Sequence, residues 1–298
     1  MDSVFDVFQS VKNLLYLGNY TASMDEANNT DINEEDISQV VKKYFYIFIS
    51  CIEEQKTEEL NTFLAMLKES QNEYIKVYYN IFLFFTIYIY KNQFIQQKFE
   101  KLYNELKGKK YDPVLVPAIY IISLMLLDRN ENENFLALVS KFEQDIEILL
   151  LKFYLFFKLN KQEEMEKIVN MLNIKEPDSI ITQFASILLN IYTKNDYESS
   201  ITNLQQINKN NKITVKLFNL IGVSLMSKGE FESATKALVL GKELAEKNGI
   251  ATKDYLAVVV NLITAYRNTY NEEEVRSCED LLKKTDPNNL YFSRLNQF

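Results

Sequence analysis

A pattern of apolar residues repeats in the carboxyl-terminal half of the chain at a spacing of 34 positions, the difference between residues 218 and 184. The matched positions are Phe184 and Phe218, Ile187 and Ile221, Ile191 and Leu225, Tyr197 and Phe231, and Leu204 and Leu238. Apolar residues three or four positions apart share one helix face, so each period predicts a helix, a turn and a second helix. Such periods stack as helical hairpins, each against its neighbours, which predicts an all-α fold.

The residues inside one period specify how its two helices meet. Gly222 in the first predicted helix and Ala234 in the second are small enough to let the helices approach closely. Gly229 stands at the end of the first helix, where a left-handed cap carries no Cβ penalty. This period with these small residues is typical of tetratricopeptide repeats. We therefore predict an all-α fold, a right-handed α-solenoid of about eight tetratricopeptide-like helix hairpins.

Polar breaks between the apolar segments predict the turns of these hairpins. They fall at Gly18-Asn19, Gln55-Lys56, Lys91-Asn92, Arg129 to Asn134, Asn160-Lys161, Asn195-Asp196, Lys228-Gly229 and Thr269 to Asn271. We expect a single solenoid over residues 1–298, with degenerate helical hairpins in 1–145, better-formed repeats in 146–287 and a carboxyl-terminal tail in 288–298. Between the seventh and eighth hairpins, residues 247–253 form an insertion that lengthens a loop.

Three apolar stretches, residues 78–90, 113–127 and 146–159, need a separate explanation. Each is shorter than the roughly 20 residues that span a bilayer, so we predict buried helices of the solenoid. The amino terminus carries Asp2 and Asp6 and lacks a basic region followed by a long apolar run. We therefore expect no secretory signal and a cytosolic location.

Composition excludes several function classes. The chain has no histidine, which removes Ser-His-Asp and Cys-His hydrolysis and the common zinc sites. A net charge of -8, with lysines scattered among acids, argues against nucleic acid as a partner. Cys51 and Cys278 lie in apolar helical contexts, so we expect buried thiols rather than a disulfide or redox pair.

Clustered acidic residues are the remaining candidates for catalysis. They occur at Glu34-Glu35-Asp36, Glu53-Glu54, Glu58-Glu59, Glu163-Glu164 and Glu272-Glu273-Glu274. We expect them at turns or in the first turn of a helix, where acids favour the helix dipole and are solvated. Gly241-Lys242 and the Gly108 to Lys110 segment lack the other residues of a phosphate-binding loop. The sequence therefore predicts no catalytic residue, cofactor, metal or small-molecule substrate.

A binding surface is predicted along the inner face of the first helix of each hairpin. We counted along the first helix of each of the last four hairpins to find the residues on this inner face. They are Glu147, Leu150, Tyr154 and Phe157 in the fifth hairpin, Thr182, Ala185, Leu189 and Tyr192 in the sixth, Lys216, Asn219, Val223 and Met226 in the seventh, and Ala257, Val260, Thr264 and Arg267 in the eighth. The candidates for partner contact are Leu150, Tyr154, Phe157, Leu189, Tyr192, Lys216, Asn219, Val223, Met226, Val260 and Arg267. This surface is apolar and aromatic, and it suits a helical or extended protein segment. Alternatively, the same positions pack against the solenoid's own elements.

The amino-terminal stretch VFQSVKNLLYLGNYTASMDEA, residues 7–27, resembles the opening of the coatomer epsilon subunit family. The matching residues are Phe8, Val11, Lys12, Asn13, Tyr16, Gly18, Tyr20, Glu26 and Ala27. Two further segments are similar, one from Leu217 through Gly229 to Ala234 and one from Val260 to Ile263. The resemblance covers nearly the whole chain, more by pattern than by residue in its middle third.

This resemblance implies a non-catalytic structural subunit of the COPI vesicle coat, coatomer. It implies a solenoid that binds the C-terminal region of alpha-COP, acts in Golgi-to-ER and intra-Golgi transport, and reaches Golgi membranes only through the coat. The alternative is a generic tetratricopeptide adaptor or co-chaperone in another complex. A third class, an enzyme with a site that the sequence pattern does not reveal, is also open.

Overall fold

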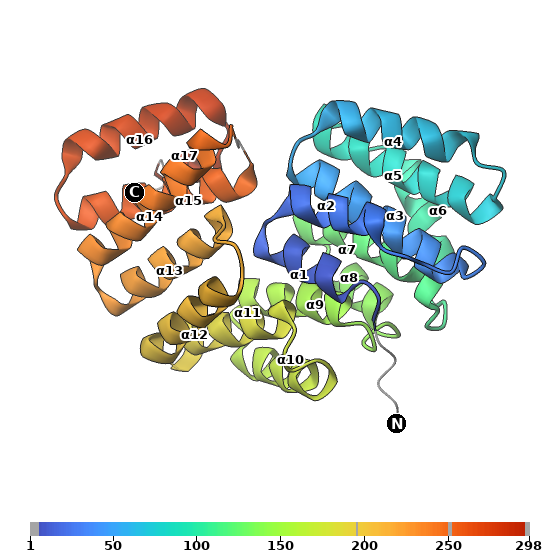
Figure 1. Ribbon diagram of the computed structural model, residues 1–298, viewed down its shortest axis with the longest axis horizontal. Coiled ribbons are helices and arrows are strands. Elements are labelled where there is room, and N and C mark those ends of the chain that lie inside the picture. Colours follow the sequence, from blue (N-terminus) through green and yellow to red (C-terminus); the bar gives the residue numbers. More distant parts are fainter. Residues whose placement is uncertain (1–5, 195, 250–251, 296–298) are drawn as a thin grey trace. The chain divides into compact units, whose positions relative to one another are not determined.

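Regular structure in the described part of the chain is entirely helical. The computed structural model describes residues 6–194, 196–249 and 252–295 (Figure 1). The first helices are α1 Gln9–Leu17, α2 Tyr20–Asn29, α3 Ile37–Glu53, α4 Thr57–Glu69, α5 Glu73–Lys91, α6 Gln96–Leu106, η1 Pro113–Leu115, α7 Val116–Asp128, α8 Asn132–Val139, α9 Ile146–Lys158 and α10 Gln162–Lys175. The others are α11 Ile180–Leu189, η2 Asn190–Lys194, α12 Tyr197–Asn210, α13 Val215–Lys228, α14 Phe231–Lys247, α15 Lys253–Asn268, α16 Glu272–Thr285 and α17 Leu290–Leu295.

These helices form consecutive hairpins from α1/α2 to α15/α16, which confirms the predicted hairpins and their turns within the described residues. In the seven turns described in full, one residue has the left-handed backbone conformation, with φ between 49° and 87°. The residues are Gly18, Gln55, Asn92, Asn130, Asn160, Gly229 and Tyr270. Glycine and asparagine tolerate this conformation best, so the turn geometry explains most of these residues. The turn between α11 and α12 includes Asn195, which lies outside the described residues.

The helices cluster into two compact units. Unit 1 comprises residues 1–16 and 20–186, and unit 2 comprises residues 17–19 and 187–298. In unit 1 the three long apolar stretches fall in α5, in η1 with α7, and in α9. As predicted, α7 and α9 are largely buried, and α5 buries one face, whereas η1 has no buried residue. Phe48 of α3 and Phe82 of α5 stack with ring centroids 4.2 Å apart. Burial of each ring contributes about 2 kcal/mol to the stability of this core.

The core of unit 2 lies among α13, α14, α15 and α16, which follow one another in Figure 1. At Gly222 an added Cβ would lie 2.5 Å from Cγ of Leu238, so the predicted close approach of α13 and α14 requires glycine there. Gly229 caps α13 with φ 87°, as the repeat pattern predicts. The sequence register therefore specifies both the packing and the turn of this hairpin.

Three local features differ from the simplest helical hairpins. Residues 190–194 form a turn of π-helix, which the repeat pattern did not indicate. Helix α17 lies in the segment predicted as a tail. Glu53 ends α3 and Glu54 is its C-cap, so this acidic pair lies at a turn but not at a helix start. No helix in the described residues is both long and apolar enough to cross a membrane.

Candidate partner-binding face

In unit 1, the predicted inner face of α9 begins with a buried carboxylate. Asp145 caps the amino terminus of α9 by accepting hydrogen bonds from the backbone N–H groups of Glu147 and Ile148. This cap holds Glu147 at the start of the helix, where its side chain is only 1% exposed. A buried carboxylate is costly unless it is paired or hydrogen-bonded, so its neighbours are informative.

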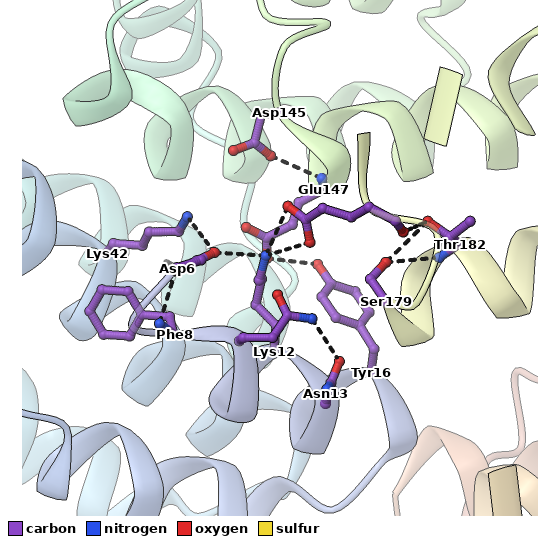
Figure 2. A network of polar contacts seen from close by, with 12 residues as sticks. Asp6, Phe8, Lys12, Asn13, Tyr16, Lys42, Asp145, Glu147, Ser179 and Thr182 are labelled. Atoms are coloured by element: carbon purple, nitrogen blue, oxygen red, sulfur yellow. Dashed lines mark hydrogen bonds and ion pairs between the residues drawn. The ribbon is translucent and has the colours of Figure 1, made fainter. Parts of the chain in front are cut away.

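Two tyrosines donate hydrogen bonds to Glu147 (Figure 2 shows Tyr16). The hydroxyl of Tyr16, from α1, lies 3.0 Å from Oε1, and the hydroxyl of Tyr46, from α3, lies 3.0 Å from Oε2. The hydroxyl of Tyr120, from α7, is 3.5 Å from that of Tyr16. Side chains of α1 and α3 therefore meet at a carboxylate of α9, and a side chain of α7 joins them through Tyr16.

Lys12 supplies positive charge beside this carboxylate (Figure 2). Its side chain is 3% exposed, and its Nζ lies 2.7 Å from Asp6 and 3.2 Å from Glu176. Lys42 of α3 lies 3.8 Å from the same Asp6 carboxylate. The charge of Lys12 is thus neutralised by carboxylates of unit 1 itself.

The electrostatics of this network depend on burial. Burial raises the pKa of Glu147 to about 7, Asp145 acts in the same direction, and Lys42 and Lys12 oppose it. Burial also raises the pKa of Tyr16 and of Tyr46 well above the usual range, so both hydroxyls remain protonated donors. For Lys12, burial lowers the pKa, but Glu147 and Asp6 outweigh it and the net shift is upward.

The candidate residues on α9 divide into two groups. Leu150 is buried, so its side chain packs in the core of the chain itself. Tyr154 is exposed and meets Phe153 edge to face at 6.2 Å between ring centroids, and Phe157 is half-buried. The network around Glu147 occupies the beginning of the predicted face, and the aromatic side chains follow it along α9.

The candidate face of unit 2 lies mainly on α13 and α15, which pack against one another. Lys216, Asn219, Val223, Met226 and Val260 are all half-buried. Met226 and Val260 pack partly against the core of unit 2 and leave part of their surface open. The structure therefore brings these candidates to the surface of one helix pair.

The two helices are joined by an amide pair that the sequence did not reveal. Nδ2 of Asn261 donates a hydrogen bond of 2.7 Å to Oδ1 of Asn219. Asn219 is one of the residues predicted to contact a partner. Asn261 is not, because the predicted inner face of α15 does not include it, and its side chain reaches Asn219 on α13. The only indication of this contact in the sequence is that each of the two helices carries an asparagine.

The other candidates of unit 2 differ in their surroundings. Leu189 is buried and belongs to the core, while Tyr192 in η2 is exposed. Arg267 lies 2.6 Å from Glu279 and its guanidinium is 5.6 Å from the ring centre of Tyr291. Its charge is therefore already paired within unit 2.

These hairpins define the class of the protein as an all-α solenoid of tetratricopeptide-like repeats. A solved structure of a tetratricopeptide repeat protein from Parabacteroides merdae has the same fold, with a TM-score of 0.51 and 9% sequence identity over 97% of this chain and 95% of that chain. The model of the coatomer epsilon subunit family matches residues 4–297, and the chain belongs to this family. A search of curated protein sequences finds no match.

Family membership assigns the chain a subunit role in coatomer, the COPI vesicle coat. The structure also explains five of the amino-terminal residues that carry the resemblance. Phe8 and Val11 are buried in unit 1, and Lys12 and Tyr16 surround Glu147. Gly18 in unit 2 needs its left-handed turn. These residues are thus explained by packing and pairing inside the chain.

Proposed function

We propose that this protein is a non-catalytic structural subunit of the COPI coat that binds the C-terminal region of alpha-COP. The observation that carries the proposal is the family match over residues 4–297. A half-buried, largely neutral surface on α13 and α15 supports a protein partner, because such surfaces gain free energy when apolar side chains leave water.

The proposed transport steps are Golgi-to-ER and intra-Golgi traffic. The protein would act in the cytoplasm and reach Golgi membranes and COPI vesicles through the assembled coat. Its contribution is stabilisation by binding, since a partner that binds only the folded solenoid raises the stability of both chains. Tyr154, Phe157 and Tyr192 are further candidate contacts within this proposal.

The direct test is affinity capture of the tagged chain from its own cells. We expect alpha-COP to be recovered at equal stoichiometry with the tagged chain. Recovery of chaperones without coatomer would instead support a generic tetratricopeptide co-chaperone and contradict the coat proposal.

The variant Met226→Glu tests the surface. A carboxylate in an apolar interface is costly to desolvate, so binding to the alpha-COP C-terminal region should weaken by at least about tenfold. Ser227→Glu is the matched control, because Ser227 is the next residue of α13 and is exposed. Circular dichroism should show equal helicity in both variants. Unchanged affinity in the folded Met226→Glu variant would remove this surface from the proposal.

A further inference from the structure

The amide pair on α13 and α15 has unused hydrogen-bonding capacity. The bond from Asn261 Nδ2 to Asn219 Oδ1 uses one donor of Asn261 and one acceptor site of Asn219. The Asn219 NH₂ group, the Asn261 carbonyl oxygen, the second N–H of Asn261 and a second lone pair on Asn219 Oδ1 are left over. Among the described residues, neither amide makes another side-chain hydrogen bond, and both side chains are half-buried and not sealed in the core. The Asn219 NH₂ group and the Asn261 carbonyl oxygen therefore offer a donor and an acceptor to a ligand at the same place.

The surroundings of this pair are apolar on α13 and partly polar beside Asn261 on α15. Val223 and Met226 on α13 and Val260 on α15 are half-buried. Beside Asn261, a shallow groove of 370 Å³ is lined by the apolar Leu256, Ala257 and Val260 and by the polar Lys253, Asn261, Asp286 and Asn289, and the α13 residues lie next to it on the neighbouring helix. A segment bound across α13 and α15 would place apolar side chains against Val223, Met226 and Val260, and its polar groups against the amides of Asn219 and Asn261.

The chemistry of the pair selects among possible occupants. A peptide unit in an extended chain offers one C=O and one N–H, which match the free donor of Asn219 and the free acceptor of Asn261. A helix has already used most of its backbone groups internally, so its backbone would leave the remaining donor of Asn219 and acceptor of Asn261 buried without partners. In the groove Lys253 is accompanied by Asp286, so it does not offer the concentrated positive charge that favours an acidic tail or nucleic acid.

We propose that Asn219 and Asn261 bind the main chain of an extended segment of the partner protein. This inference rests on the proposed function, because it describes how the alpha-COP region is held. Asn219 donates to a backbone carbonyl, Asn261 accepts from a backbone N–H, and Val223, Met226 and Val260 contact the flanking side chains. The main-chain bonds fix the register of the segment, and the apolar contacts supply most of the affinity.

The central variant is Asn219→Asp, which separates the two roles of Asn219. Aspartate still accepts the hydrogen bond from Asn261, so the link between α13 and α15 is kept, but it has no N–H to donate. Its carboxylate would face the partner's carbonyl oxygen. We expect affinity for the purified alpha-COP C-terminal region to fall by about tenfold or more, with an unchanged melting temperature. A purely structural role of Asn219 would give the opposite pattern.

Two further variants complete the design. Asn268→Asp adds the same charge on α15 at an exposed position outside the groove, and it should bind like the wild type. Asn261→Leu replaces the acceptor with an apolar side chain of similar size, so it tests the same binding site if Asn219→Asp does not fold. Either Asn219→Asp or Asn261→Leu binding with wild-type affinity would overturn the inference and leave the proposed function intact. A wild-type chain that did not bind the alpha-COP region would overturn both.

Hydrogen exchange on the partner gives an independent result. In the wild-type complex, backbone amides of the bound segment should be protected in an alternating pattern, and Asn219→Asp should reduce this protection. Uniform protection over consecutive amides, as in a bound helix, would overturn the proposal.

Discussion

The two units use the predicted inner faces of their helices differently. In unit 1, Lys12 and Tyr16 of α1 reach the carboxylate of Glu147 and its neighbours, so that side chains of the same chain fill the polar site. In unit 2, Asn219 and Asn261 bond to each other and leave hydrogen-bonding capacity at the surface. A polar group buried with its partners specifies the fold, whereas a polar pair at a half-open surface is suited to recognition.

The largest expected difference between the units is in the loss of stability when the polar side chain at the centre of each site, Glu147 or Asn219, is replaced. Glu147→Leu should lower the free energy of unfolding by about 3–4 kcal/mol, because two buried tyrosine hydroxyls and Lys12 lose their acceptor or counter-charge. Asn219→Leu should lower it by less than about 1 kcal/mol, because water already reaches that amide. Equilibrium urea unfolding of both variants measures the contrast, and equal losses would show that the two sites are energetically alike.

The second expected difference is in how the free energy of unfolding depends on pH, because Glu147 in unit 1 is a buried titratable group. The folded-state pKa of Glu147 is raised from 4.5 to about 7, so the folded chain keeps a proton that the unfolded chain releases. The stabilisation from this group is present below pH 4.5 and is lost as the pH rises through 7, with a total on the order of 3 kcal/mol.

The control for this titration is Glu147→Gln. Other carboxylates change stability in the opposite direction: burial raises the pKa of Asp6, but Lys42 and Lys12 outweigh it and lower the pKa overall. The difference in unfolding free energy between wild type and Glu147→Gln between pH 5 and 8 isolates Glu147. A difference that does not vary with pH would mean that Glu147 is charged in the folded state throughout this range.

The smallest expected effect concerns one turn in each unit. Gln55 in unit 1 and Tyr270 in unit 2 have φ of 59° and 56°, although neither is glycine or asparagine. Tyr270 is 91% exposed, so its ring gives little packing in return. Gln55→Asn and Tyr270→Asn should each raise the unfolding free energy by about 0.5–1 kcal/mol. Tyr74→Asn, an exposed tyrosine in an ordinary helix, should not. Loss of stability in Tyr270→Asn would show that the tyrosine ring contributes to unit 2.

The sequence predicted the features that depend on neighbouring residues. The spacing of Phe184 and Phe218, the small residue at Gly222 and the cap at Gly229 reflect contacts within one hairpin or between adjacent ones. The turn asparagines Asn130 and Asn160 are local too, but their left-handed conformation could not be recognised because asparagine is abundant throughout this chain.

The polar network of unit 1 could not be predicted in this way. Glu147 lies 131 residues from Tyr16 and 101 residues from Tyr46, and a 34-residue period carries no information about such pairs. One indication was present: Glu147 is the only charged residue in the run from Ile146 to Leu151. The amide pair was equally hidden, since the count along each helix treats neighbouring helices as independent.

The long separation between α1 and Glu147 has a consequence for synthesis on the ribosome. Tyr16 emerges 131 residues before the carboxylate that it will contact, a delay of about 10 s at ordinary translation rates. A solenoid otherwise gains most of its contacts from the helix just made. The first helix must therefore wait, with Lys12 still hydrated, until α9 has been synthesised. Closure of this contact is a late, non-local step in an otherwise sequential folding process.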